Sequence, residues 1–296
     1  MKRARLIYNP SSGREEFVKK LPEILDMFEQ AGYETSCHAT KGPGDATLAA
    51  QRAIQRGFDL IIAAGGDGTL YEVVNGMAER KGRPPLGIIP AGTTNDFARA
   101  IGLPIRNVQK ACEEIINGVP QPIDIGKIND KYFINIAGFG ALTDLTYEVP
   151  SKLKTILGQL AYYMKGIEKL PFIRPSQVRI ETEFRVIEEE IMLFLISNSN
   201  SVGGLEKLAP HADLSDGKFD CIIVRKTTLP EFIRIASRVI KGDHIKEPDV
   251  IYFQTKRLKA TSTANVMINL DGELGGELPI DFTALPSHID VIMPKK

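Results

Sequence analysis

The sequence predicts an α/β protein in which a three-layer domain with a parallel sheet is followed by a second, largely antiparallel β-rich domain. Two observations lead to this class. Short apolar runs alternate with helical patterns over the first 125 residues, and closely spaced strand patterns take over after that. We expect domains at 1–125 and 126–296, with the extreme C-terminus able to pack back on the first domain.

The first domain alternates strands with helices in a Rossmann-like manner. The predicted strands, each ending at Gly, Pro or Asn, are Arg5–Tyr8, Leu60–Ala64 and Leu86–Pro90. The predicted helices are Glu16–Ala31, Ala46–Gly57, Leu70–Glu79 and Asn107–Asn117. Apolar residues in the first helix recur at spacings of three and four, as one buried helix face requires. Such alternation is typical of a parallel sheet covered on both faces.

The second domain has the period of half-buried strands. From Val178 to Val186, every second residue (Val178, Ile180, Thr182, Phe184 and Val186) is apolar or Thr, which predicts one strand. Further predicted strands are Ile191–Ser197, Phe219–Val224, Val250–Gln254, Leu258–Thr263 and Val266–Leu270. The single clear helical pattern among them is Leu229–Lys241.

Composition excludes several classes of protein. Lys plus Arg and Asp plus Glu both number 37, so the formal net charge is zero, which argues against a general nucleic-acid binder. The isolated cysteines Cys37, Cys112 and Cys221 suggest reduced, buried thiols and an intracellular location. No apolar run approaches the roughly 20 residues that span a bilayer.

The most informative segment is Gly65-Gly66-Asp67-Gly68-Thr69, between an apolar strand and a helix. Glycines at such a junction let the backbone approach a ligand, and the helix N-terminus favours phosphate. Asp67 would repel phosphate unless Mg²⁺ lies between them or the carboxylate aids the reacting hydroxyl. The alternative is a strand–helix turn with an Asp cap.

Two more polar loops follow predicted strands. Pro90–Phe97 includes Thr93, Thr94, Asn95 and Asp96, whose side chains can donate or accept hydrogen bonds or approach a metal. Asn9–Gly13 ends the first strand. Because open parallel sheets bind ligands at the carboxyl ends of their strands, we expect the three loops to converge on one ligand.

The order Asn-Pro-x-Ser-Gly, Gly-Gly-Asp-Gly-Thr, Pro-x-Gly-Thr-x-Asn-Asp resembles the diacylglycerol kinase catalytic family in its soluble bacterial branch. Sphingosine and ceramide kinases share these motifs, and NAD kinases share the second. The resemblance runs from Asn9 to the C-terminal strands. It implies an ATP-dependent kinase with a nucleotide site at Asn9, Pro10, Ser11, Ser12, Gly13, Thr40, Gly66, Asp67, Gly68, Thr69, Leu70, Tyr71, Glu72 and Thr93.

A second candidate site is Asp271-Gly272-Glu273, after the predicted strand Val266–Leu270. A carboxylate can orient an attacking alcohol and take its proton, although a turn with incidental acids is the alternative. The family resemblance implies that Glu273 is the catalytic base, acting together with Asp67. We expect the active site in a cleft between the domains.

The oxygen-rich segment 213–218 could hold a hard cation or be a solvated turn. The resemblance implies a structural Mg²⁺ here, bound by Asp213, Asp216 and the main-chain carbonyl of Lys218. It also implies that Asp96 and Asp124 join through water.

Residues Lys152–Arg174 combine an apolar helical stripe with basic residues, which fits an anionic membrane surface. A core-facing helix with a solvated basic face is the alternative. We therefore expect a cytoplasmic enzyme, peripheral at the inner membrane surface, that phosphorylates diacylglycerol with ATP and Mg²⁺. Its partners would be that membrane lipid and, transiently, an anionic membrane surface, but not nucleic acid. The sequence leaves open whether the chain forms a homodimer.

Three rival functions remain. The acceptor could be a sphingoid lipid or another glycerolipid, or it could be NAD. Outside enzymes, the chain could be a nucleotide-gated lipid-binding protein, although such a binder has no need of a base such as Glu273.

Overall fold

The computed structural model describes residues 1–12, 16–105, 107–140, 175–202 and 205–295. The chain forms two compact units, one made of Met1–Ile125 with Pro286–Lys296 and the other of Gly126–Leu285. The long strands β5 (Val119–Ile128) and β15 (Ile280–Met293) each contribute to both units. Gly13 and Lys152–Arg174 lie outside the described residues.

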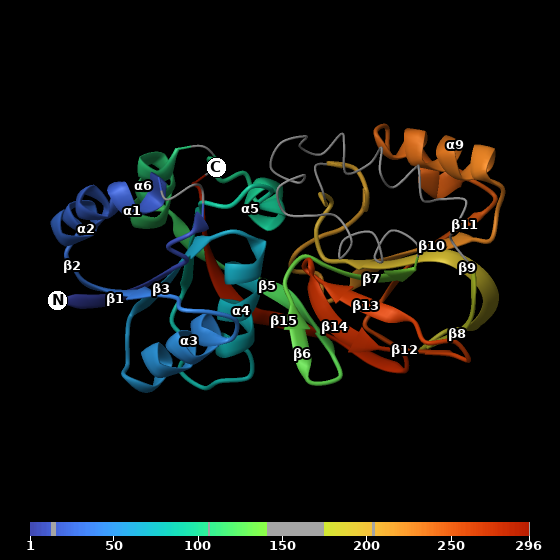
Figure 1. The fold of residues 1–296 in the computed structure, drawn as a ribbon, viewed down its shortest axis with the longest axis horizontal. Helices are drawn as coiled ribbons and strands as arrows, with labels where there is room; N and C mark the ends of the chain where they lie inside the picture. The colour runs from blue at the N-terminus through green and yellow to red at the C-terminus, as the bar shows by residue number, and fades with distance from the viewer. Residues whose placement is uncertain (13–15, 106, 141–174, 203–204, 296) are drawn as a thin grey trace. The chain divides into compact units, whose positions relative to one another are not determined.

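The first unit is built on a parallel sheet (Figure 1). Its strands are β1 (Lys2–Tyr8), β2 (Tyr33–Ala39), β3 (Leu60–Gly65), β4 (Leu86–Pro90) and the last part of β15. They lie in the order β2-β1-β3-β4-β15, and every neighbouring pair is parallel. All carboxyl ends of these strands therefore lie along one edge of the sheet.

Helices cover both faces of that sheet, which makes three layers (Figure 1). One face carries α1 (Glu16–Lys19), α2 (Leu21–Gln30) and α6 (Val108–Asn117). The other carries α3 (Asp45–Gln55) and α4 (Asp67–Met77), and the short helix α5 (Asp96–Ala100) follows β4. Close packing of α3 on α4 depends on Gly76, because a Cβ there would lie 2.4 Å from the Thr47 carbonyl oxygen.

Local chemistry explains two differences from the predicted elements. The predicted helix Glu16–Ala31 is divided into α1 and α2 at Lys20, just before Pro22, which has no N–H to continue a helix but suits its first turn. The edge strand β2 was not predicted because its sequence, YETSCHA, is half polar. Among the described strands it pairs with β1 alone, so the hydrogen bonds to β1 establish this strand rather than its sequence pattern.

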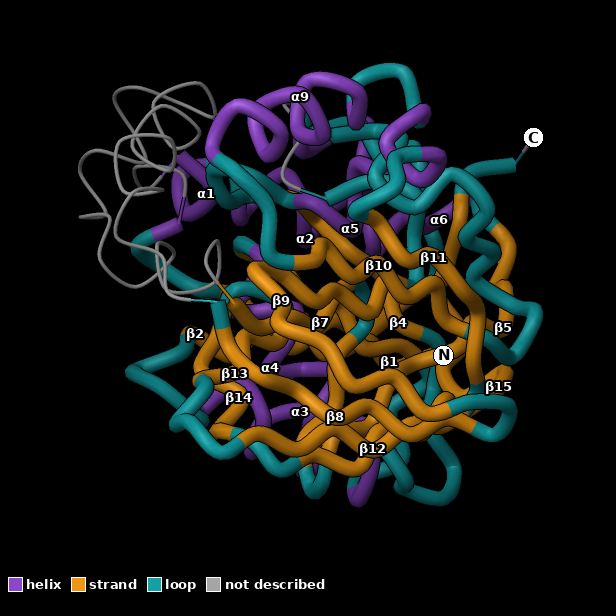
Figure 2. The backbone as a smooth tube through the Cα atoms, turned by 90° about the vertical axis from the view of Figure 1, so that its right-hand side faces the viewer, coloured by secondary structure: helices purple, strands orange, loops and turns teal. Residues whose placement is uncertain are grey.

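The second unit consists mainly of strands, drawn in orange in Figure 2. Its neighbouring strands pair antiparallel. Besides parts of β5 and β15, its strands are β6 (Lys131–Phe133), β7 (Ile136–Gly140), β8 (Ser176–Thr182), β9 (Val186–Ser197), β10 (Phe219–Arg225), β11 (Val250–Thr255), β12 (Arg257–Ser262), β13 (Met267–Leu270) and β14 (Glu273–Glu277). The long strand β9 pairs with β7, β8 and β10, so these four strands form one continuous sheet.

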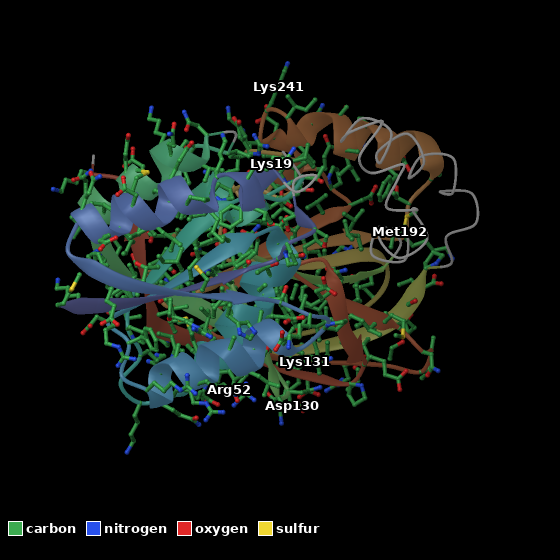
Figure 3. The ribbon with its side chains drawn as sticks, turned by 60° about the vertical axis from the view of Figure 1, so that its left-hand side comes forward. Lys19, Arg52, Asp130, Lys131, Met192 and Lys241 are labelled. Carbon is green, nitrogen blue, oxygen red and sulfur yellow. The ribbon has the colours of Figure 1, made fainter. Side chains whose placement is uncertain are left out.

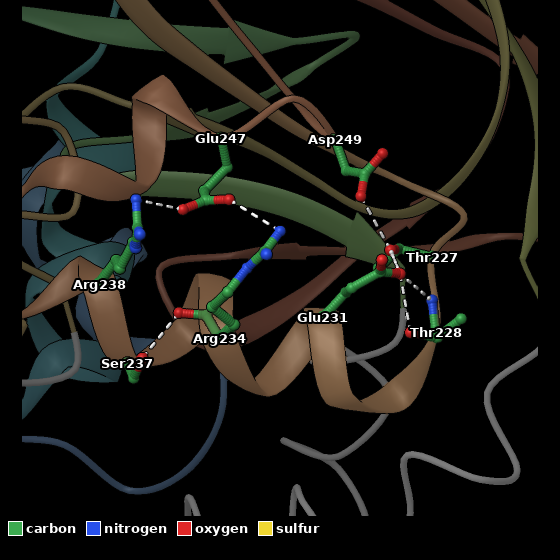
Figure 4. Close-up of polar contacts among 8 residues, drawn as sticks. All are labelled: Thr227, Thr228, Glu231, Arg234, Ser237, Arg238, Glu247 and Asp249. Atoms are coloured by element: carbon green, nitrogen blue, oxygen red, sulfur yellow. Dashed lines mark hydrogen bonds and ion pairs between the residues drawn. The ribbon is translucent and has the colours of Figure 1, made fainter.

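Helix α9 (Leu229–Val239) covers the β9 and β10 side of this unit, and the 3-10 helix η3 (Asp243–Lys246) follows it. Phe232, Ile235 and Val239 are buried against apolar residues of those strands. Figure 4 shows the polar contacts along α9, where Glu247 is almost completely buried and pairs with Arg234 at 3.1 Å and Arg238 at 2.5 Å. Two half-exposed arginines thus balance one buried carboxylate.

The prediction of one strand from Val178 to Val186 is wrong beyond Thr182. The Thr182 hydroxyl oxygen accepts hydrogen bonds from the N–H groups of Phe184 (3.2 Å) and Arg185 (3.1 Å), and this turn separates β8 from β9. Phe184 is consequently 84% exposed. Among the described residues, no helix has the length and apolar character needed to span a membrane.

Candidate active site

Three loops meet at the carboxyl edge of the parallel sheet in the first unit. They follow β1, β3 and β4, which lie side by side in the order β1-β3-β4. Main-chain hydrogen bonds join them: Asn9 N–H donates to the Ala64 carbonyl (3.1 Å), and Ala91 N–H donates to that of Gly65 (2.9 Å). The parallel topology therefore brings together the three motifs that the sequence singled out.

The loop after β3 leads directly into α4. Gly66 is the N-cap, in an extended conformation, and its carbonyl accepts hydrogen bonds from the N–H groups of Thr69 and Leu70, both at 3.1 Å. Thr69 is buried and packs over the sheet end, where a Cβ on Gly65 would lie 2.4 Å from its Oγ1 atom. The start of α4 thus offers a helix N-terminus reached through glycine, which suits an anionic ligand.

Asp67 has a role that the sequence could not show. Its carboxylate accepts hydrogen bonds from the N–H groups of Asn95 (3.0 Å) and Asp96 (2.8 Å) and so caps α5, a helix 29 residues further along the chain. These two bonds fix the position of the Asp67 carboxylate at the edge of the sheet.

Asn95 is the residue whose importance sequence reasoning underestimated. It is 3% exposed and has a left-handed backbone (φ 51°), a conformation that Asn tolerates. Its side chain accepts from Gly92 N–H (3.0 Å) and donates to the Gly92 carbonyl (2.9 Å). This ring of bonds shapes the loop on which Thr93 is exposed, and the Asn after Gly-Thr-Thr is the sequence signal for it.

A small pocket opens among these loops. The residues that line it come from β3, the start of α4, β4 and the Asn95 loop. They are Ala63, Gly65, Gly66, Asp67, Leu70, Ile88, Pro90, Asn95 and Ala98. The lining is mainly apolar, with glycine main chain, the Asp67 carboxylate and the Asn95 amide as its polar groups.

The side chain of Asn9 holds the loop after β1 in a tight turn. Asn9 Oδ1 accepts hydrogen bonds from the Ser11 N–H (3.0 Å) and hydroxyl (2.8 Å), and the Ser12 N–H donates to the Asn9 carbonyl (3.1 Å). Pro10 forms part of this turn. Thr40 lies beside it, since its N–H donates to the Tyr8 carbonyl (2.9 Å). Thr40 therefore stands at the same sheet edge as the other loops.

Glu72 faces another helix. Its Oε1 and Oε2 atoms accept hydrogen bonds from Gly44 N–H (2.7 Å) and Ala46 N–H (3.0 Å) at the start of α3. The Thr47 hydroxyl also donates to the Glu72 carbonyl (2.9 Å). Glu72 therefore caps α3 and ties it to α4, while its neighbour Tyr71 is half-buried.

The start of α3 also holds a charged group. Asp45 Oδ2 accepts from Lys41 N–H (2.9 Å) and lies 3.1 Å from His38 Nε2. The Lys41 N–H, followed by the His38 contact, lowers the pKa of Asp45. The loop that follows Thr40 is thus fixed by both Asp45 and Glu72.

In the second unit, Glu273 follows a tight turn between β13 and β14. Asp271 (φ 50°) and Gly272 (φ 95°) both have left-handed backbones, as a two-residue Asp-Gly hairpin turn requires. Glu273 is exposed at the first position of β14 and pairs with Leu270. Next to it, the Lys131 ammonium, labelled in Figure 3, donates to the Leu274 carbonyl at 3.0 Å.

The predicted metal residues lie on the loop before β10, at the start of α5 and inside β5. Asp213 Oδ1 accepts from both the N–H and the hydroxyl of Ser215 (2.9 Å each), and Asp216 Oδ1 accepts from Lys218 N–H (2.8 Å). Asp96 is the first residue of α5, and buried Asp124 accepts from Ser287 N–H (2.7 Å). In the part of the chain that the structure describes, no three His, Cys, Asp or Glu side chains gather as a metal site.

Beside that loop, burial raises the pKa of Asp220 to about 6. Its carboxylate interacts with the hydroxyl of Tyr252 and accepts from Gln254 Nε2 at 3.1 Å. Asp220 was not predicted as a site residue, because in the sequence it is one polar position inside an apolar strand.

Comparisons with known proteins assign both parts of the chain to families. Residues 3–128 match the family described as diacylglycerol kinase catalytic domain, and residues 137–293 match the YegS C-terminal NAD kinase beta sandwich-like domain. The predicted α/β class is confirmed by a crystal structure of a diacylglycerol kinase from Bacillus anthracis (strain Sterne). Its TM-score is 0.85 at 29% identity, with 99% of this chain and 97% of that chain covered.

Curated relatives match from end to end. The chain is 59% identical over 296 residues to a diacylglycerol kinase of Bacillus subtilis (strain 168), which covers 100% of this chain and 98% of the relative. It is 50% identical over 293 residues to one from Staphylococcus aureus (strain MRSA252), covering 99% and 93%. The predicted resemblance and enzyme class are thereby confirmed, and the chain belongs to the diacylglycerol kinase family.

Proposed function

We propose that this protein transfers the γ-phosphate of ATP to the free hydroxyl of diacylglycerol, forming phosphatidic acid. The observation that carries the proposal is the start of α4, where Gly66 and Asp67 stand at the same sheet edge as the loops after β1 and β4. Membership of the diacylglycerol kinase family supports this acceptor.

The nucleotide's phosphates would bind at the N-terminus of α4, where Gly66, Gly68 and Thr69 supply main-chain groups and partial positive charge. The exposed Thr93 and the Asn9–Ser12 turn would bind the rest of the nucleotide from the two neighbouring loops. Thr40 adds a hydroxyl beside that turn. Leu70, Tyr71 and Glu72 lie in the first turns of α4 and would contribute to the nucleotide site by holding that helix in place.

The donor set fits Mg²⁺, which prefers oxygen ligands and binds through one or two carboxylates together with substrate phosphates and water. Asp67 is the carboxylate at the start of α4, and two N–H donors of the loop after β4 hold it in place. In the second unit, Asp213, Asp216 and the Lys218 carbonyl would supply an all-oxygen set for a structural ion. Bound beside the phosphates, Mg²⁺ would neutralise the charge that develops during transfer.

In the reaction, a lone pair of the lipid hydroxyl forms the new P–O bond while the bond to the bridging β–γ oxygen breaks. ADP leaves with that electron pair. Glu273 takes the hydroxyl proton, so its carboxylate orients the attacking oxygen before transfer and holds the proton after it. The exposure of Glu273 at the tip of a hairpin leaves it accessible to a substrate.

The enzyme would work from the cytoplasm at the inner membrane surface, because its acceptor is a membrane lipid. The basic segment Lys152–Arg174 remains our candidate for contact with anionic lipid. A homodimer is a further proposal, and analytical ultracentrifugation of the purified chain tests it.

Transfer of labelled phosphate tests the proposed function directly. The purified protein would be incubated with γ-labelled ATP, Mg²⁺ and one acceptor at a time: diacylglycerol, monoacylglycerol, sphingosine or NAD. We expect label in the lipid product with diacylglycerol and almost none with the other three. Label in NADP would favour NAD kinase, which the β-sandwich match brings into the panel. Lipid binding without transfer would favour the non-enzymatic alternative.

A further inference from the structure

Asp271, two residues before Glu273, anchors the hairpin that carries the proposed base. Its carboxylate is buried and accepts hydrogen bonds from three consecutive main-chain N–H groups. Oδ2 accepts from Ile134 (2.7 Å), and Oδ1 accepts from Asn135 (2.9 Å) and Ile136 (2.8 Å). In return, Asp271 N–H donates to the Ile136 carbonyl (2.9 Å). Four hydrogen bonds thus join this turn to the segment between β6 and β7.

That segment is itself held from behind by residues that follow β9. Asn198 N–H donates to the Asn135 carbonyl (2.8 Å), and the Asn198 side-chain amide donates to the Ile134 carbonyl (2.8 Å). The Ser199 hydroxyl donates to Asn135 Oδ1 at 2.5 Å. All of these residues are at most 3% exposed. The support of Asp271 is therefore part of the buried interior, not a surface loop.

Glu273 is held on both sides along the chain. On the side of the turn, Asp271 is bonded to 134–136, and Gly272 N–H donates to Asn269 Oδ1 (2.8 Å). On the other side, Lys131 Nζ donates to the Leu274 carbonyl (3.0 Å). Its main chain is thus fixed at both neighbours while the residue itself is exposed. Such an arrangement suits a group that must meet a reacting atom in one geometry.

We propose that Asp271 is a positioning residue for Glu273, and that the buried residues Asn135 and Ser199 extend its support into the core. The inference rests on the proposed function, because it presumes that Glu273 takes the proton. It predicts that Asp271 acts on turnover through Glu273 alone and leaves the nucleotide site unaffected.

The variant Asp271→Asn tests this with almost no change of volume. Its side-chain oxygen can still accept from Asn135 and Ile136, but its NH₂ group would face the Ile134 N–H, a donor against a donor. We expect kcat to fall roughly 10- to 100-fold, since small misplacement of a reacting group has costs of this size. The KM for ATP should stay within about twofold of the wild-type value, as the proposed nucleotide residues all belong to the other unit.

Glu247→Gln is the matched control. Glu247 is another buried carboxylate of the same unit, but its ion-pair partners are Arg234 and Arg238 on α9 (Figure 4). Its thermal midpoint should fall while kcat stays within about twofold of wild type. An equal kcat loss in both variants would mean that general destabilisation explains the effect, and would overturn the proposal.

A double-mutant cycle separates positioning from a purely structural role. If Asp271 acts through Glu273, Asp271→Asn should lower kcat in the wild type and have no further effect in Glu273→Gln. Equal fold-losses in both backgrounds would refute the inference. If Asp271→Asn fails to fold, Ser199→Ala takes its place in the same cycle, because it removes the bond to Asn135 and two bonds with the Ser201 main chain but none to Asp271.

The cycle also distinguishes this inference from the proposed function. Full activity of Glu273→Gln would show that Glu273 is not the base, whatever Asp271 does. A large loss in Glu273→Gln together with unchanged kcat in Asp271→Asn would leave the base in place and overturn the positioning role alone.

Discussion

Gly92 and Gly66 approach each other so closely that a Cβ atom on Gly92 would lie 2.3 Å from the Cα atom of Gly66. The same Cβ would lie 2.9 Å from Asn95 Oδ1, the acceptor that shapes the loop after β4. The reverse substitution is milder, because a Cβ on Gly66 would lie 3.3 Å from Gly92 Cα. Two of the proposed nucleotide loops therefore fit against each other through bare main chain.

Gly92→Ala should weaken ATP binding by at least about tenfold, because the loops must separate to admit the methyl group. Gly66→Ala requires a shift of only a few tenths of an ångström and should weaken binding less. Calorimetric titration of both folded variants with ATP measures the difference. Equal affinities in Gly92→Ala and wild type would contradict the nucleotide assignment of these loops.

Glu72→Gln should lower the free energy of unfolding by about 1–3 kcal/mol, because one of the two N–H donors at the start of α3 then loses its carboxylate acceptor. Glu29→Gln, on the exposed side of α2, is the control and should have almost no effect. Urea denaturation measures both. Because Glu72 is also a proposed nucleotide residue, we expect a higher KM for ATP; an unchanged KM would confine it to capping.

Glu273→Gln keeps the side chain's size and removes the base, so kcat should fall roughly 10²- to 10⁴-fold with ATP affinity little changed. Glu277→Gln, at the other end of the same strand β14, should retain activity. Labelled-ATP transfer to dispersed diacylglycerol measures both rates. Turnover of Glu273→Gln within a few-fold of wild type would exclude it as the base.

Asp216→Ala should remove a Mg²⁺-dependent gain in stability. A cation that binds only the folded protein raises its thermal midpoint, so the wild type should melt higher when Mg²⁺ is added. The variant should show a smaller rise, whereas Asp130→Ala, which changes an exposed aspartate at another turn, should behave like wild type. Identical Mg²⁺ responses in all three proteins would argue against a structural ion at 213–218.

Stability should fall as the pH drops below about 6.5, because burial lowers the pKa of His244. This histidine is 1% exposed, and its Nε2 contacts the Leu208 carbonyl at 2.8 Å. Below that pH, His244 takes up a proton in the unfolded chain but stays neutral in the folded one. The stability that His244 contributes is therefore fully present above its unfolded pKa and is lost as the pH falls below it. His244→Gln can keep the bond to Leu208 and should flatten this slope between pH 7 and 5. An unchanged slope in denaturation curves would rule His244 out as its source.

Local patterns in the sequence determined most of the elements. Strand β4 begins and ends where its apolar run predicts, and β3 and α6 do so within one residue, because periodicity and flanking Gly, Pro and Asn are properties of neighbouring residues. The motifs on the loops were visible for the same reason. The half-polar strand β2 could not be predicted from its own residues, because its hydrogen bonds to β1 are what make it a strand.

Tertiary structure decided what the carboxylates contact. Asp67 caps a helix 29 residues further on, Glu72 caps one that starts 27 residues earlier, and Asp271 accepts hydrogen bonds from residues 135 to 137 positions away. A single sequence shows that an Asp or Glu is present, but its partner depends on which chain segments the fold brings together. Buried carboxylates must find N–H donors or cations wherever the topology supplies them, and these supports appear only in three dimensions.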